Sequence, residues 1–167
     1  MKKIVLGQRN NNPLNIRKVP GTRWIGSLTP DLEPRRDREV APLCGAAATS
    51  SRCSEAPVAP QGEGRFVRFV SIEFGLRAAY QILDTYKQKY HAVCIEDIIT
   101  RWAPPSENDT EAYIRSVCTL TGFGGKERLT EAEWPALVKA MALIESRMHL
   151  DENVLKTAYN LYLNLKR

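Results

Sequence analysis

The chain has 167 residues, of which 43% are hydrophobic and 26% charged, a balance typical of one globular domain with a buried core. Its net charge of +5 favours an anionic partner, such as a bacterial envelope, a nucleic acid or an acidic protein. The sequence contains no nucleic-acid-binding signature and no block of Lys and Arg interleaved with aromatic residues, so we expect no nucleic-acid partner.

The N-terminal segment reads MKKIVLGQ, and its apolar run covers only residues 4–6. That run is too short for the core of a signal peptide, and no other segment is long and apolar enough to span a membrane. We therefore expect a protein made in the cytoplasm without a signal peptide and without membrane insertion. Work outside the cytoplasm would need another export route.

The first third of the chain predicts turns and an elaborated loop. Residues 9–26, RNNNPLNIRKVPGTRWIG, are rich in Asn, Pro and Gly, which is typical of ordered turns leading to a short strand around Trp24. Residues 27–64 are rich in proline around an Ala/Ser-rich centre, and we expect a long loop or hairpin insertion there. We expect the whole chain, 1–167, to form a single domain.

The rest of the chain predicts a strand followed by helices. Residues 65–70, RFVRFV, are a predicted strand, and Ser71 is placed to cap a helix that runs to about Tyr90. Further helices are expected at about 94–101, after the loop SENDT, at 130–146 and at about 152–165. The predicted fold class is mostly α (α+β): a helical domain with a small β-hairpin lobe.

The helix predicted at 130–146 carries an unusual acidic residue. Thr130 and Glu133 have the spacing of a capping box, and apolar residues recur at helical spacing from Trp134 onward. Glu145 falls in the middle of this apolar stripe. A carboxylate there is either paired to a cation, extended to solvent at the helix end, or kept for chemistry, because burying an unpaired charge is expensive.

Four cysteines permit three pairings. We expect Cys44–Cys53 within the long loop and Cys94–Cys118 between two helices, which would place the working protein in an oxidising compartment. The alternative is four buried, reduced thiols. The cysteine spacings match no zinc pattern and the chain has only two histidines, so we expect neither a metal site nor a cofactor.

Several short motifs resemble glycoside hydrolase family 73, whose members are lysozyme-like peptidoglycan N-acetylglucosaminidases. Residues 11–17, NNPLNIR, resemble the family signature Asn-Asn-Leu-Phe-Gly-Ile-Lys, with Asn15 in place of the glycine. Asn tolerates left-handed backbone better than other non-glycine residues, so the turn can survive the replacement. Residues 24–26 are similar to Trp-x-Gly, residues 65–71 to Phe-Arg-x-Tyr-x-Ser, and residues 101–113 to Arg-Tyr-Ala-Thr-Asp-Pro-x-Tyr.

One departure from the family pattern concerns the catalytic glutamate. In that family it lies on a helix before the Asn-Asn motif, whereas here no carboxylate precedes Asn12. Residues 140–146, AMALIES, resemble that helix but lie near the other end of the chain. We therefore expect a circularly permuted relative, since compact domains tolerate permutation. The pattern also resembles lysozyme-like proteins of phage virions and peptidoglycan-cleaving glycoside hydrolase effectors of type VI secretion.

The resemblance implies a peptidoglycan glycoside hydrolase, either N-acetylglucosaminidase or muramidase, that acts in the periplasm of a target bacterium. As an antibacterial effector it would have a cognate immunity protein as a second partner beside the glycan strand. The alternative is a virion or baseplate component with a lysozyme-like fold that binds glycan without cutting it.

The resemblance also implies roles for individual residues. Glu145 becomes the expected general acid. The family's second carboxylate lies in the β-lobe, where this chain offers Glu33, Glu39, Glu55 and Glu63. Of these we expect Glu63, because the glycines on either side of it let backbone and sugar approach closely. A plain hairpin-turn residue is the alternative for Glu63, and core packing is the alternative for the tryptophans. The expected substrate-binding residues are Asn12, Asn15, Trp24, Trp102 and Tyr113.

Overall fold

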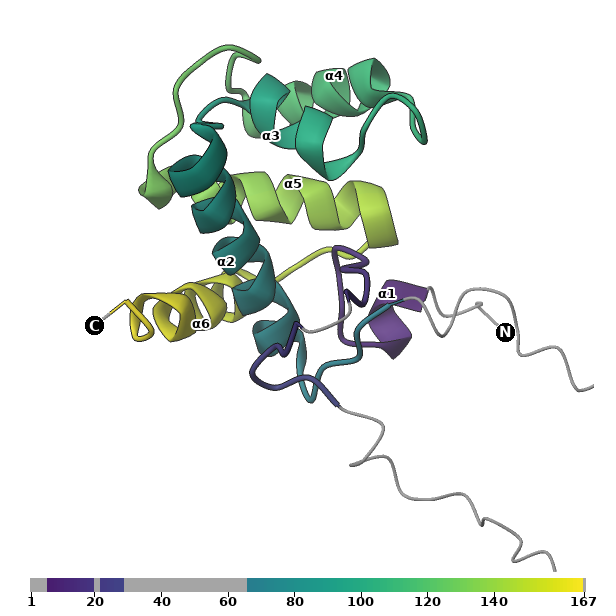
Figure 1. Cartoon of the computed structure of the whole chain (residues 1–167), viewed down its shortest axis with the longest axis vertical. Coiled ribbons are helices and arrows are strands. Elements are labelled where there is room, and N and C mark those ends of the chain that lie inside the picture. The colour runs from purple at the N-terminus through teal and green to yellow at the C-terminus, as the bar shows by residue number, and fades with distance from the viewer. Residues whose placement is uncertain (1–5, 20–21, 29–65, 167) are drawn as a thin grey trace, which may run out of the picture.

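The computed structural model describes residues 6–19, 22–28 and 66–166 (Figure 1). The predicted Cys44–Cys53 disulfide and Glu63 lie outside these residues, as does nearly all of the predicted insertion 27–64. The described part is mostly helical, as predicted. Its helices are α1 Leu6–Arg9, α2 Ile72–Tyr90, α3 Ile95–Trp102, α4 Thr110–Thr121, the 3₁₀ helix η1 Glu131–Glu133, α5 Trp134–Ser146 and α6 Glu152–Leu163.

Helix α5 is the centre of the arrangement. It packs against α1, α2, α4 and α6, while α3 packs on α4 and α6 packs across α2 (Figure 1). Leu137, Val138 and Met141 of α5 are fully buried, as the helical spacing of the apolar residues predicts. Because α5 touches four other helices, the side chains at its C-terminal end have positions fixed from several directions.

The helix boundaries follow the predicted signals closely. The capping box of Thr130 and Glu133 is present, with the Thr130 amide donating to the Glu133 carboxylate at 2.6 Å. Helix α4 ends at Gly122, whose φ of 78° is left-handed and suits glycine. Helix α2 begins after Ser71, although the Ser71 side chain makes no capping hydrogen bond. No helix in the described ranges is long and apolar enough to cross a membrane.

The predicted β-hairpin lobe is not present in the part of the chain that the structure describes. The segment around Phe66 and Phe69 makes two isolated antiparallel bridges, Arg17 with Phe66 and Ser27 with Phe69. Segment 66–69 therefore lies between two different segments, 16–17 and 27–28, and forms a single bridge with each of them. Single bridges of this kind are not a strand ladder, which explains why the alternating pattern of RFVRFV overpredicts a strand.

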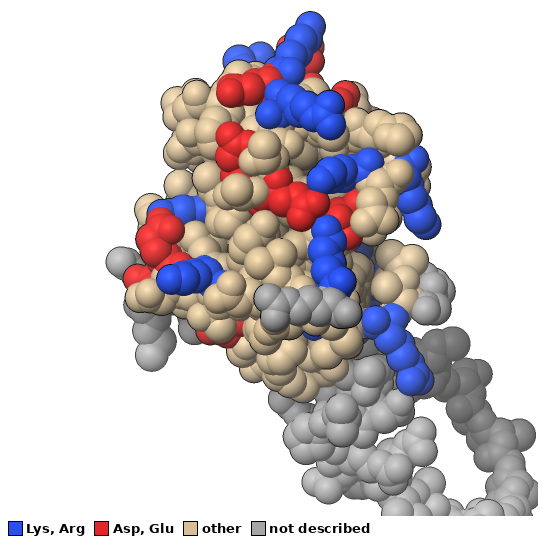
Figure 2. All heavy atoms as spheres, turned by 90° about the vertical axis from the view of Figure 1, so that its left-hand side faces the viewer, with Lys and Arg blue, Asp and Glu red and all other residues tan. Residues whose placement is uncertain are grey.

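An aromatic and ionic cluster fixes α6 on α2. The Tyr80 ring lies 5.2 Å from that of Tyr159 and 5.9 Å from that of Tyr162, distances typical of stabilising aromatic pairs. At the edge of this cluster, Lys166 lies 3.0 Å from Asp84 and 3.2 Å from Glu131. Figure 2 shows acidic and basic side chains lying next to each other on this face of the molecule.

Glu131 is the hub of these ion pairs and gives a prediction for stability against pH. Its Oε1 atom accepts a hydrogen bond from Lys87 at 2.7 Å, and chiefly this bond holds the pKa of the Glu131 carboxyl below its ordinary value. A lowered pKa in the folded state adds stability above the unfolded-state pKa, and this stability is lost as the pH falls through the folded-state pKa. Glu131→Gln should therefore lower the unfolding free energy by about 1 kcal/mol at pH 7.

The difference between wild type and Glu131→Gln should shrink in chemical denaturation between about pH 5 and pH 3. Glu111→Gln is the matched control. Glu111 is 88% exposed, and its i,i+4 pair with Arg115 has a distance of 3.6 Å, so this pair is weaker than those of Glu131. It should change stability by less than about 0.5 kcal/mol at any pH. A pH-independent loss in Glu131→Gln would contradict an ionic contribution.

Candidate active site

The site is built on the turn formed by residues 10–17. Asn12 is completely buried, and its amide makes three hydrogen bonds: Oδ1 accepts from Ile16 N at 2.8 Å, and Nδ2 donates to Ile16 O at 3.0 Å and Val67 O at 2.9 Å. Asn11 and Asn15 both have φ of 50°, so the left-handed conformation expected for Asn15 is confirmed. The amide of Asn12 thus supplies the partners that hold this turn in shape.

Two glycines let neighbouring helices approach this turn closely. A Cβ atom on Gly75 of α2 would lie 2.2 Å from the backbone oxygen of Asn11, and one on Gly7 of α1 would lie 2.0 Å from Ser146 Oγ. Ser146 itself donates a buried hydrogen bond of 2.6 Å to the backbone oxygen of Pro13. The end of α5 and the Asn-rich turn are therefore in direct contact, which confirms the contact that the permutation hypothesis required.

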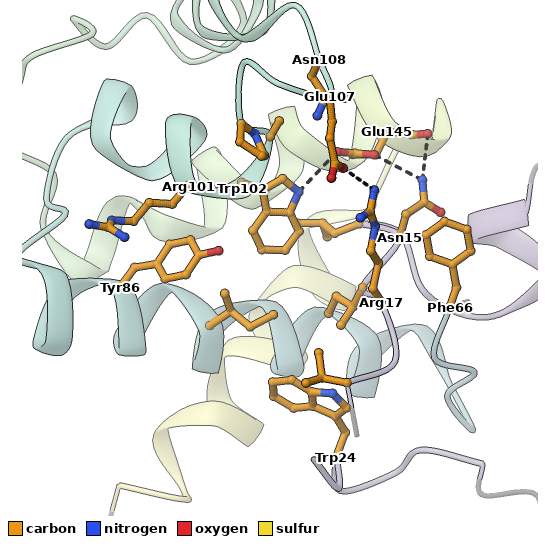
Figure 3. A pocket seen from close by; sticks show the side chains of 16 residues that line it. Asn15, Arg17, Trp24, Phe66, Tyr86, Arg101, Trp102, Glu107, Asn108 and Glu145 are labelled. Carbon is orange, nitrogen blue, oxygen red and sulfur yellow. Dashed lines mark hydrogen bonds and ion pairs between the residues drawn. The ribbon is translucent and has the colours of Figure 1, made fainter. Parts of the chain in front are cut away.

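Glu145 lies at this junction and is held by three neutral donors. Its Oε1 atom accepts hydrogen bonds from Trp102 Nε1 at 3.3 Å and from the Tyr113 hydroxyl at 3.1 Å. Its Oε2 atom accepts from Asn15 Nδ2 at 3.3 Å, and the same amide also reaches the backbone oxygen of Glu145 (Figure 3). The half-buried carboxylate makes no ion pair with a Lys or Arg of the described residues, so the salt-bridge alternative is wrong within that part.

The environment of Glu145 keeps its tyrosine neighbour protonated. Burial, together with the adjacent Glu145 carboxylate, raises the pKa of Tyr113 well above its ordinary value. The Tyr113 hydroxyl is therefore a hydrogen-bond donor to Oε1 across the whole physiological pH range. Oε1 accepts from two side-chain donors and Oε2 from one, so Oε2 is the less occupied oxygen.

A groove with a volume of about 540 Å³ opens over Glu145, within the size range of ligand sites. Asn15 and Phe66 lie at one end of it, Trp102 lies between them and Arg101, and Trp24 lies lower in the view (Figure 3). Arg17 and Glu107 face each other across the groove in an ion pair of 2.9 Å. Glu145 and Glu107 are the two carboxylates that line it among the described residues.

The structure places the expected substrate-binding residues in two groups. Asn15, Trp24 and Trp102 line the groove. Direct substrate contact by Asn12 is wrong, because this side chain is 0% exposed and is consumed by backbone groups. Tyr113 is not part of the groove lining and acts through its hydrogen bond to Glu145.

The predicted Cys94–Cys118 disulfide is also wrong. Both cysteines are free thiols in the structure. Cys94 is the N-cap residue of α3, and its sulfur points into the first turn of that helix, where it lies 3.1 Å from Asp97 Oδ2. We expected the two cysteines to pair because they lie near the ends of adjoining helices, but the Cys94 side chain is directed to Asp97. Among the described residues no group of His, Cys, Asp and Glu could hold a metal ion.

Sequence reasoning did not assign the other lining residues to the groove, among them Arg17, Tyr86, Arg101 and Glu107. Arg17 and Arg101 belong to motifs noted above, yet nothing in their spacing indicated that they face a cavity. Glu107 lies in the polar loop after Trp102 and Tyr86 lies in α2, and neither position carries a sequence signal for a cavity. These side chains reach the groove only because α2, the 104–108 loop and the turn pack together.

Fold and site together define a mostly helical domain with one glutamate held by neutral donors at a groove. The chain is 35% identical over 142 residues to Protein P5 of Pseudoalteromonas phage PM2, and the match covers 84% of this chain and 70% of that protein. The chain belongs to the family of this phage protein, whose name states no activity. No protein-family model matches the chain.

The contact between α2 and the turn predicts whether alanine at position 75 stabilises or destabilises the fold. Glycine is a poor helix former, so alanine at a tolerant helical position stabilises by about 1 kcal/mol. Gly75→Ala should instead lower the unfolding free energy by about 1–3 kcal/mol, because the new methyl group meets the Asn11 backbone oxygen. Gly124→Ala, whose Cβ would have its nearest contact at 3.5 Å, should change stability by less than about 0.5 kcal/mol. Stabilisation by Gly75→Ala would show that the turn can move away.

Proposed function

We propose that this protein is a peptidoglycan glycoside hydrolase and that Glu145 is its general acid. The proposal is supported chiefly by one observation, the half-buried Glu145 carboxylate that faces a groove and is held by Asn15, Trp102 and Tyr113. Acid catalysis requires a carboxyl group placed rigidly beside the leaving oxygen. Amide and indole groups around it suit N-acetylated sugars, which present amides and apolar ring faces.

The proposed reaction uses the two oxygens of Glu145 differently. Oε1 accepts from Trp102 and Tyr113, so the transferable proton resides on Oε2, beside the Asn15 amide. This proton passes to the glycosidic oxygen as its bond to the anomeric carbon breaks. A water molecule forms the new bond to that carbon and gives its proton to a second carboxylate, the base of an inverting reaction.

Two residues are candidates for the second carboxylate. Glu63 is the candidate from the family resemblance, and Glu107 is the other acidic side chain of the groove. Asn15 bonds to Glu145 and Arg17 pairs with Glu107, so side chains only two positions apart in sequence hold both acids (Figure 3). This arrangement favours Glu107, because one short segment of the turn holds both acids in the same groove.

The resemblance to glycoside hydrolase family 73 extends the proposal to a lysozyme-like, circularly permuted domain with a β-lobe in the 27–64 region. The buried contact between Ser146 and Pro13, which joins residues 133 apart, supports the permutation. Family membership with a phage protein favours delivery by a phage particle or during phage lysis over delivery as a secreted effector with an immunity protein. It equally favours the second candidate, a virion component that binds glycan without cutting it.

The central test is hydrolysis of purified cell walls by wild type and Glu145→Gln, followed as loss of turbidity and release of reducing ends. The glutamine keeps an acceptor for Trp102 and Tyr113 but has no proton to transfer. Hydrolysis should fall by at least about 100-fold with unchanged folding. Glu111→Gln on the exposed face of α4 should retain full activity. Wild-type protein that binds walls without releasing reducing ends would favour the non-catalytic alternative.

A second pair of variants separates catalysis by Glu107 from tethering of its loop. Glu107→Gln and Arg17→Gln both break the same ion pair, but only the first removes a carboxylate from the groove. We expect at least about a 100-fold loss of turnover in Glu107→Gln and less than about a 10-fold loss in Arg17→Gln. Equal, small losses of turnover in both variants would mean that the ion pair only holds the loop. Glu63 would then be the remaining candidate for the second carboxylate.

A further inference from the structure

The groove over Glu145 continues into a second hollow. This hollow has a volume of about 740 Å³ and is bordered by Tyr90 and the exposed side of α3. Tyr86, Arg101 and Pro104 line both cavities, so the two hollows adjoin on the surface, and together they are called the channel. Figure 3 shows Arg101 and Tyr86 together at the end of the groove opposite Asn15 and Phe66. A ligand that reaches from Glu145 past Trp102 must therefore pass Arg101.

Arg101 is the fixed positive charge of this second hollow. Its guanidinium carbon lies 3.9 Å from the centroid of the Tyr90 ring, and the Tyr86 ring lies 6.3 Å from that of Tyr90. Arg101 makes no ion pair with any carboxylate of the described residues, although Asp97 precedes it by one helical turn. Stacking on an aromatic face orients a guanidinium while leaving its N–H edge free to bind a carboxylate through two parallel hydrogen bonds.

The acidic residues on the rim narrow the chemistry of the ligand. Glu96 and Asp97 also line the second hollow, and these carboxylates suit an amino group. The lining therefore matches an arm that carries both a carboxylate and an amine, rather than a simple anion. Muramyl residues of peptidoglycan carry such an arm, a lactyl ether extended by a peptide with free carboxylate and amino groups.

We propose that the second hollow binds the acidic side arm of a muramyl residue, with Arg101 as the group that recognises its carboxylate. This inference rests on the proposed function, because it takes the glycan strand as the ligand of the adjoining groove. It adds a specificity determinant that the groove around Glu145 lacks: discrimination between peptidoglycan and a neutral polymer of N-acetylglucosamine.

The test measures binding of three soluble tetrasaccharides to the full chain carrying Glu145→Gln, which stops turnover. The ligands are a neutral N-acetylglucosamine oligomer, a muramyl-containing fragment without peptide, and the same fragment with its peptide. Adding Arg101→Gln should weaken binding of the peptide-bearing fragment by about tenfold or more, the usual scale for a lost charge-assisted pair, and leave the neutral oligomer unchanged. Arg115→Gln removes the same charge from α4, outside the channel, and should have no effect on any of the three ligands.

The fragments also identify which carboxylate is bound. If Arg101→Gln weakens binding of both muramyl fragments, Arg101 binds the lactyl carboxylate. If it weakens binding of the peptide-bearing fragment alone, Arg101 binds a carboxylate of the peptide. Either result supports the proposal. Equal penalties on all three ligands, or none, would overturn it. If the wild-type protein fails to release reducing ends yet this binding preference holds, the hydrolase assignment fails and the binding site stands.

Discussion

The buried amide of Asn12 is the interaction on which the site depends. It bonds three backbone groups, two of its own turn and one at Val67, that would otherwise be desolvated without a partner. By fixing the turn it also fixes Asn15 and Arg17, whose side chains hold Glu145 and Glu107. A side chain with no contact to the groove therefore orders one of the partners of each carboxylate.

Small residues and helix packing turn this local order into a site. Gly75 of α2 and Gly7 of α1 allow the turn to approach two helices, and Ser146 joins it to the end of α5. Since α5 packs on four other helices, Glu145 cannot shift without disturbing the core. Its donors come from three separate parts of the chain, the turn, α3 and α4, so the carboxylate has a geometry that no single segment could impose.

Charge along the channel changes from neutral donors around Glu145 to charged groups farther along, which fits the glycan ligand that we propose. Around Glu145 the donors are neutral, whereas the mouth has the Arg17–Glu107 pair and the second hollow has Arg101 with two acidic residues. Neutral donors orient a reacting carboxylate without pairing it to a fixed cation. Under the proposed function, charged groups farther along would select what the glycan carries at a distance from the bond that reacts.

The sequence by itself determined the helices from α2 onward, the Thr130–Glu133 cap and the exceptional position of Glu145; the short helix α1 was not predicted. Apolar spacing, the Thr130–Glu133 capping box and Gly122 are local signals, and local signals specify local structure. It also predicted the left-handed Asn15, because few residue types tolerate that backbone. Two predictions that depend on a distant partner were wrong. The strand predicted at 65–70 forms only isolated bridges in its described part, and the Cys94 side chain contacts Asp97 and not Cys118.

Tertiary structure alone decided which polar residues meet. Asn12 is buried although its motif suggested a ligand contact, and Arg17, Tyr86, Arg101 and Glu107 reach the channel although no periodicity marked them. The bond from Asn15 to Glu145 joins residues 130 apart in sequence. Such contacts depend on how whole helices pack, and packing is a property of the complete set of surfaces rather than of any one segment.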